Sequence, residues 1–143
     1  MRTLFSIATM AIMTITVSAQ QLKEHRWNDR VLLLYTDDLA NPQYERQIRE
    51  LQRDWQGAED RRIVVYTILK ERYARGLPAE SWVRKASPLK LPATGFYLEL
   101  VGLDGGTKLR EEQYQPIADL WSLIDGMPIR RSELSKKRNP KRF

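Results

Sequence analysis

The sequence predicts an α/β domain built on a four-stranded mixed sheet with flanking helices. Two apolar, β-branched runs separated by an amphipathic helix predict a parallel βαβ unit in the first half. A hairpin followed by a second amphipathic helix predicts a ββα unit in the second half. The order βαβ and then ββα is typical of the thioredoxin-like arrangement.

The N-terminal segment has the pattern of a secretion signal. Arg2 gives a positive start, Leu4–Val17 is apolar and uncharged, and Val17-Ser18-Ala19 is a small-residue cleavage site. The apolar run is too short and too often interrupted by Ser and Thr for a comfortable membrane span. We expect cleavage after Ala19, which gives an exported protein, periplasmic or secreted, with no transmembrane segment. A buried N-terminal helix and an uncleaved anchor are the alternatives.

Residues 1–19 are therefore assigned to the signal, residues 20–134 to one domain, and residues 135–143 to a basic, disordered tail. The chain has a net charge of +6, which comes almost entirely from the residues after Ile129. The candidate anion-binding residues of the tail are Lys136, Lys137, Arg138, Lys141 and Arg142. Because Phe143 is the only large apolar residue of the tail, little burial is available to offset the entropy of ordering.

The first half of the domain is expected to contain two central strands joined by a helix. Val31–Leu34 and Ile63–Leu69 are continuous apolar runs, typical of strands buried on both faces. Asn41 is a helix cap, Pro42 takes the first helical position, and Gly57 ends the helix. Its buried face is expected to consist of Tyr44, Ile48, Leu51 and Trp55.

The second half is expected to contain the hairpin and a C-terminal helix. Phe96–Val101 and the more charged Thr107–Glu112 are its strands, the latter at a sheet edge, and Gly102–Gly106 is its turn. Pro116 opens the helix and Gly126 ends it. The face of this helix that we expect to be buried consists of Ile117, Leu120, Trp121 and Ile124.

The segment Lys70–Thr94 has the least regular pattern. Leu77-Pro78 is expected to start a short helix that runs through Trp82 to Ala86. Trp82 and Met127 are expected to be core or covering residues. Pro128 is expected to prevent the C-terminal helix from continuing.

The composition excludes several kinds of chemistry. The chain has no cysteine, which removes thiol catalysis, thiolate metal sites and disulfide exchange. Its one histidine, His25, cannot build a His-based metal site and is expected to be solvated. Spacing assembles neither a catalytic triad nor a carboxylate pair, so we assign no catalytic residue, metal or cofactor and favour a non-enzymatic function.

An ungapped comparison with a thioredoxin shows where a redox site would lie. When the first strand and active-site turn of a thioredoxin are aligned with Val31–Gln43, VLLLYTDDLANPQ, the two redox cysteines of the thioredoxin align with Ala40 and Gln43. The proline between those cysteines aligns with Pro42. The redox site is therefore empty. Pro92 comes shortly before the third strand, where a thioredoxin-like fold carries its cis-proline.

Three motifs carry a family resemblance: WNDRVLLLY, GLDGGTKLR and LIDGMPIRRSEL. From Trp27 to Leu134 the chain resembles small secreted bacterial proteins of unknown function related to the peroxiredoxin-like DUDES domain, which also occurs in vertebrate sushi-repeat and matrix-associated proteins. The resemblance implies a thioredoxin-like fold without established catalysis. Leu103 departs from the polar or basic residue expected in the turn. Within the two C-terminal motifs, the residues that we single out as family-motif residues are Gly102, Asp104, Gly105, Gly106, Lys108, Arg110, Asp125, Met127, Pro128 and Arg130.

The residues of these motifs also have structural explanations. The Asp-Gly-Gly sequence is most simply turn chemistry, and a backbone anion cradle is a weaker alternative because a strand follows it. Lys108 and Arg110 share a solvated strand face with Glu112. Asp125 ends a helix, where an acid is unfavourable and needs a partner. The candidate partners are Arg110, Arg130 and Arg131.

Three functions are consistent with these features. The leading one is a non-enzymatic exported module that binds a protein or another envelope component. The second is an electrostatic binder whose tail contacts an anionic surface polymer or lipid, with no dedicated nucleic-acid partner. The third, a degenerate peroxiredoxin-like oxidoreductase, lacks the thiolate that such chemistry needs.

Overall fold

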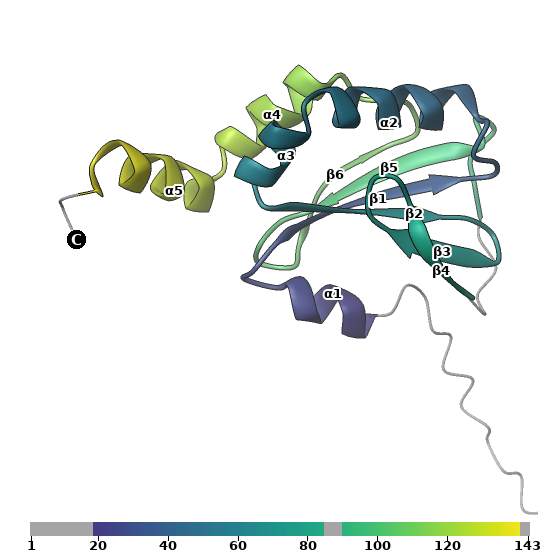
Figure 1. Cartoon of the computed structure of the whole chain (residues 1–143), viewed down its shortest axis with the longest axis horizontal. Coiled ribbons are helices and arrows are strands. Elements are labelled where there is room, and N and C mark those ends of the chain that lie inside the picture. Colours follow the sequence, from purple (N-terminus) through teal and green to yellow (C-terminus); the bar gives the residue numbers. More distant parts are fainter. Residues whose placement is uncertain (1–18, 85–89, 141–143) are drawn as a thin grey trace, which may run out of the picture.

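The computed structural model describes residues 19–84 and 90–140, which form a mixed sheet with helices on both faces (Figure 1). Six strands are hydrogen-bonded in the order β4-β3-β2-β1-β5-β6. Their bounds are Arg30–Thr36 for β1, Ile63–Ile68 for β2, Arg72–Arg75 for β3, Glu80–Arg84 for β4, Phe96–Val101 for β5 and Thr107–Glu111 for β6. The helices are α1 (Ala19–His25), α2 (Pro42–Arg53), α3 (Trp55–Asp60), α4 (Ile117–Asp125) and α5 (Pro128–Arg138).

The expected α/β class and both expected units are confirmed. β1 and β2 pair in parallel, with Val31 opposite Val64, and β1 pairs antiparallel with β5, with Leu32 opposite Leu100. β5 and β6 form the antiparallel hairpin, and β6 lies at the sheet edge. α2, α3 and α4 cover one face, whereas α1 lies on the other (Figure 1).

The sheet has six strands rather than the expected four. β3 and β4 lie in the segment with the least regular sequence pattern, and β4 lies where a short helix was predicted, so that prediction was wrong at Trp82. Gly76, with φ +107°, turns the chain between the two strands, a conformation that glycine adopts without strain. Trp82 and Val83 favour strands, and the Arg72 guanidinium lies over the Trp82 ring across the hairpin. Ala86 lies outside the described residues.

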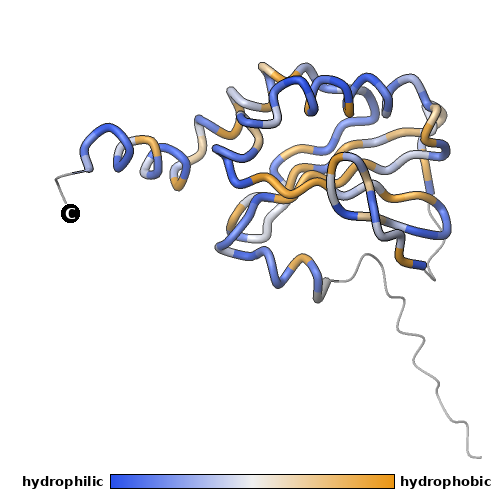
Figure 2. The backbone as a smooth tube through the Cα atoms, viewed as in Figure 1, coloured by the Kyte–Doolittle hydropathy of each residue, from blue (hydrophilic) through white to orange (hydrophobic). Residues whose placement is uncertain are grey.

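The core forms on both faces of the central strands. Under the helices, Leu32 and Leu34 of β1 pack with Leu98 of β5 and with Leu120 and Ile124 of α4. The opposite face contains a second buried cluster of Val31, Leu33, Tyr66, Ile68 and Val101. Figure 2 shows hydrophobic residues concentrated in the central strands. Burial of both faces confirms the interpretation of the continuous apolar runs.

The helix after β1 begins as expected and ends differently. The Asn41 side chain accepts the backbone N–H of Gln43, at 2.9 Å, and Pro42 occupies the first turn. The predicted single helix is two helices, because Asp54 ends α2 and caps α3 by accepting the N–H of Gly57. Gln47 of α2 is fully buried and its side chain bonds both backbone groups of Gln115, which fixes the chain between β6 and α4.

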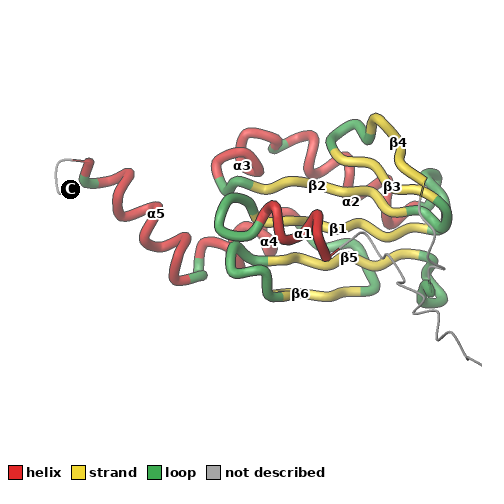
Figure 3. Tube along the Cα trace, turned by 90° about the horizontal axis from the view of Figure 1, so that it is seen from below, coloured by secondary structure: helices red, strands yellow, loops and turns green. Residues whose placement is uncertain are grey.

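The C-terminal region differs most from expectation. α4 ends at Asp125 as expected, but Pro128 starts α5 instead of stopping helical structure, since proline suits a first helical turn. α5 projects beyond the sheet (Figures 1 and 3). The residues from Ser135 to Arg138, expected in a disordered tail, are helical, and Lys137 forms an ion pair with Asp60.

Both chain ends lie partly outside the described residues. The residues outside the described ranges include most of the expected signal segment, and Lys141 and Arg142 of the expected tail. Among residues 19–84 and 90–140, no helix has the length and apolar character needed to cross a membrane.

Candidate functional site

All three resemblance motifs meet at one end of the sheet and form a pocket of about 310 Å³. The β5–β6 turn provides one wall, the junction of α4 with α5 another, and the first residue of β1 a third. We call it the motif pocket. Its lining residues are Arg30, Gly102, Leu103, Asp104, Lys108, Met127, Pro128 and Ile129. A more open hollow of about 580 Å³ beside Trp82 is lined mainly by exposed charged side chains, which water solvates already.

The turn wall is rigidly hydrogen-bonded. The Gly102 N–H donates to the Gly106 carbonyl, at 2.9 Å, which closes the turn. The Asp104 carboxylate accepts the Gly106 N–H at 2.9 Å and Lys108 Nζ at 2.8 Å. Gly105 has φ +82°, the left-handed conformation that the sequence pattern predicted. Turn chemistry therefore explains the Asp-Gly-Gly sequence, and Lys108 forms an ion pair rather than being simply solvated.

Leu103, where the resemblance led us to expect a polar or basic residue, forms part of the pocket wall. Its side chain is only 4% exposed although it lies in a hairpin turn. Its carbonyl accepts the backbone N–H of Trp27, at 2.7 Å, which ties the turn to the chain just before β1. An apolar side chain at this position therefore gives the pocket hydrophobic surface.

Arg30 provides a buried positive charge at the pocket. The residue is 1% exposed, and its Nη1 donates to the Arg61 carbonyl at 2.8 Å and to Glu133 Oε2 at 3.4 Å. Its buried Nε has no hydrogen-bond partner within the described part of the chain. Burial lowers the pKa of Arg30, although Glu133 opposes the change. This guanidinium is therefore incompletely compensated by its surroundings.

An ion-pair network fixes the start of α5 behind the pocket. Arg130 is buried and its guanidinium donates to Asp60 at 2.5 Å, to Asp125 at 3.0 Å and to Glu133 at 3.3 Å. Asp125 also accepts Arg61 Nη2 at 2.8 Å. Arg130 is thus confirmed as an expected partner of Asp125. Arg61 is a second partner that the sequence did not indicate. Arg110, another expected partner, pairs instead with Glu99.

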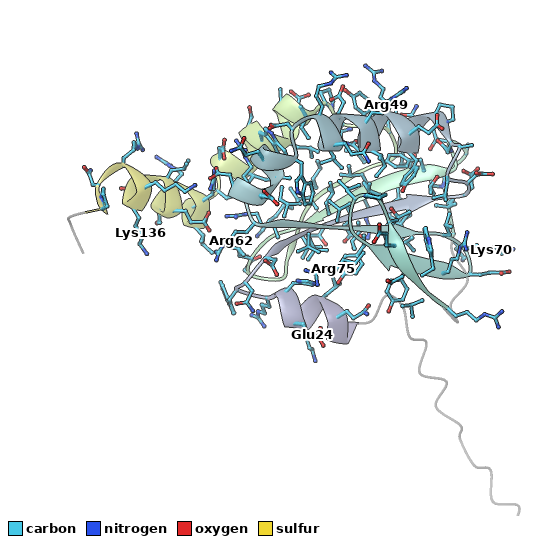
Figure 4. All side chains as sticks on the ribbon, viewed as in Figure 1. Glu24, Arg49, Arg62, Lys70, Arg75 and Lys136 are labelled. Carbon is cyan, nitrogen blue, oxygen red and sulfur yellow. The ribbon has the colours of Figure 1, made fainter. Side chains whose placement is uncertain are left out.

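The cations of this network outnumber its carboxylates. Arg62 reaches Glu133 at 3.0 Å from the side of the sheet near α5, and Lys136 lies farther along α5 (Figure 4). The members of the network are Arg30, Arg61, Arg62, Arg130 and Lys137 against Asp60, Asp125 and Glu133. This end of the domain therefore has a positive surplus beside the motif pocket.

The same cations make the three carboxylic acids stronger. Hydrogen bonds from Lys137 and Arg130 lower the pKa of Asp60 to about 2. Burial opposes ionisation of Asp125 and Glu133, yet the surrounding arginines outweigh it and lower the pKa of both. All three groups are thus held as carboxylates well below neutral pH.

The residues expected at a redox site, Ala40 and Gln43, lie near the start of α2 and form hydrogen bonds that involve the backbone. The Ala40 N–H donates to Asp38 Oδ1 at 2.8 Å, and Pro42 begins α2. Gln43 Oε1 accepts the Tyr114 N–H at 2.8 Å. The expected cis bond at Pro92 is not found: the cis bond in the described ranges is Leu77–Pro78. These groups organise the backbone and supply no nucleophile.

The interpretation of His25 as a solvated residue was wrong. It is 6% exposed and lies between Asp29 Oδ2, at 2.9 Å from Nδ1, and the Tyr66 hydroxyl, at 2.8 Å from Nε2. The position of Asp29, four residues after His25, was the one local sign of this hydrogen bond in the sequence. Tyr66 lies 41 residues away, so the sequence did not indicate its contact with His25. Because α1 lies on the second core cluster, we interpret the contact of His25 with Tyr66 as structural. Among the described residues, no group of three potential ligands could hold a metal.

Residues 21–133 match the family model described as a domain of unknown function, DUF4174. The match covers most of the chain, which therefore belongs to this family. No curated protein and no solved structure matches it. The expected assignment to a family of unknown function is confirmed, and the relation to the DUDES domain stays a prediction.

Proposed function

We propose that this DUF4174 domain is an exported, non-catalytic binding module, and that the motif pocket is where it binds a protein or another envelope component. One observation carries the proposal: three sequence motifs converge on a pocket that combines apolar walls with the buried guanidinium of Arg30. Pockets that bury an apolar group and fix it with a few polar groups are the usual form of binding sites. Export rests on the N-terminal sequence pattern.

The proposal includes a thioredoxin-like ancestry related to the DUDES domain. The strands β2, β1, β5 and β6 are consecutive in the sheet and have the expected βαβ and ββα connections. In this interpretation β3 and β4 are an insertion at one edge. The absence of cysteine and the hydrogen bonds of Ala40 and Gln43 favour a scaffold that has no redox function.

The test compares two substitutions of similar aliphatic residues. Ile129 at the pocket rim is 40% exposed and Leu123 of α4, outside the pocket, is 38% exposed. The chain from Gln20 to Phe143 is immobilised and incubated with envelope extract, and the retained components are quantified. We expect Ile129→Gln to lose components that the parent and Leu123→Gln both retain. Equal retention by all three chains would contradict a role for the pocket.

The second candidate function is electrostatic binding through α5. Its C-terminal turn contains Lys136, Lys137 and Arg138, and α5 extends past the sheet. In that case a chain ending at Leu134 would lose binding, and the binding of the full chain would weaken steeply with salt. A degenerate oxidoreductase would instead consume peroxide in a fold-dependent way without any thiol.

A further inference from the structure

We infer that the motif pocket takes the C-terminal residue of a partner polypeptide, with an aliphatic side chain against its walls and a free carboxylate toward Arg30. The inference rests on the proposed binding function and adds the chemistry of the ligand. Three features of the pocket support it: its apolar surface, its sources of positive potential and its size.

The apolar surface comes from three elements. Leu103 contributes from the β5–β6 turn, Met127 from the α4–α5 junction, and Pro128 and Ile129 from the first turn of α5. Ile129 stays 40% exposed at the rim, a large apolar side chain that the domain itself does not cover. A ligand with an aliphatic group would remove this surface from water.

Two independent features favour a negative charge in the same place. Arg30 is 1% exposed, and its Nε has no partner among the described residues. In addition, Met127 precedes α5 and provides no side-chain cap, and the positive end of this helix lies at the pocket wall. The acid in the lining, Asp104, is already bonded to Lys108 and Gly106. Glu133, which accepts Arg30 Nη1 at 3.4 Å, also pairs with Arg62 and Arg130. A carboxylate there would meet a positive surplus.

The size favours one residue. A volume of about 310 Å³ is at the lower end of the range for ligand pockets in proteins. A single C-terminal leucine is a ligand of suitable size for such a pocket.

Isothermal titration calorimetry with the chain from Gln20 to Phe143 tests this ligand directly. The probes are acetylated Gly-Ser-Gly-Ser-Gly-Leu with a free C-terminus, the same peptide as its C-terminal amide, and the free acid ending in alanine. Losing hydrogen bonds to a charged group weakens binding about 10- to 150-fold, which we expect for the amide. Losing three aliphatic carbons costs about 60-fold, which we expect for the alanine peptide.

Two variants at one exposed position identify the pocket without disturbing the core. Ile129→Glu and Ile129→Lys place opposite charges at the rim. At low salt we expect the leucine acid to bind Ile129→Lys at least fivefold more tightly than Ile129→Glu, in line with about 1 kcal/mol for one charge pair in water. Arg30→Met should abolish the preference for the acid over the amide, and circular dichroism of each variant controls for folding.

The outcomes separate this inference from the proposed function. Equal affinity for acid and amide, or no binding of any peptide, would overturn the inference. Binding of octanoate without binding of the leucine peptide would also overturn it, because the ligand would then be a free aliphatic acid. If Ile129→Gln still abolishes capture of envelope components in those cases, the proposed function stands and only the ligand assignment fails.

Discussion

Arg130→Ala is the substitution that most severely tests the ion-pair network behind the motif pocket. Arg130 is 1% exposed and donates to Asp60, Asp125 and Glu133. Removing one partner of a buried ion pair typically costs about 3–5 kcal/mol, because a charge is left without compensation. Here each carboxylate is partly exposed and keeps another cation, so we expect the lower end, about 3 kcal/mol.

The assay is urea unfolding followed by tryptophan fluorescence. With a slope near 1.5 kcal/mol per molar urea, a loss of about 3 kcal/mol lowers the midpoint by about 2 M. Arg131→Ala is the matched control, because Arg131 is the next residue in α5 and is exposed. We expect it to change the free energy of unfolding by no more than about 0.5 kcal/mol. Equal midpoints for the two variants would refute the structural role of the network.

The pH dependence identifies the cause of the loss. In the parent chain, the folded-state pKa of Asp60, Asp125 and Glu133 is lowered by their cations. The stability that these groups contribute is complete above their unfolded pKa and is lost as pH falls through the folded pKa. The difference between Arg130→Ala and the parent should therefore shrink as pH falls from about 5 to 2. A difference that is constant over this range would indicate lost packing rather than lost charge pairing.

The remaining predictions concern acid stability, the core and the C-terminal end. The parent chain should unfold at progressively lower urea as pH falls from about 5 to 2, since its depressed carboxyl pKa values favour the folded state only while the groups are ionised. A flat midpoint would contradict this. Trp121→Ala should cost about 3–5 kcal/mol, whereas exposed Leu123→Ala should cost about 0.5 kcal/mol or less, measured by the same unfolding assay. A chain ending at Leu134 should lose at most about 1 kcal/mol in a melting experiment, because the Lys137–Asp60 pair is largely exposed. Unfolding of that chain would show that the last turn of α5 is essential.

Local patterns predicted the elements whose determinants are close in sequence. The Asn41 cap, the Asp104-Gly105 turn and the buried face of α4 each depend on residues within one turn or hairpin, so spacing alone was sufficient. Continuous apolar runs likewise indicated the buried central strands β1 and β2.

Features that depend on distant partners could not be predicted. The burial of His25 depends on Tyr66, 41 residues away, whose hydroxyl shares a hydrogen bond with His25 Nε2. Arg130 and Lys137 hold α5 against Asp60, which lies 70 or more residues earlier, so composition alone indicated a disordered tail. The motif pocket itself required the structure, because Arg30, Leu103 and Ile129 belong to three motifs that lie far apart in the sequence and meet only after folding.

The most direct test of the central claim, that the motif pocket is the binding site, is a map of amide chemical shifts. The ¹⁵N-labelled chain from Gln20 to Phe143 is titrated with the peptide that ends in a free leucine carboxylate. We predict changes concentrated at residues 102–108 and 129–130, and loss of these changes in Ile129→Glu. Changes confined to the C-terminal turn of α5, or to the hollow beside Trp82, would contradict it.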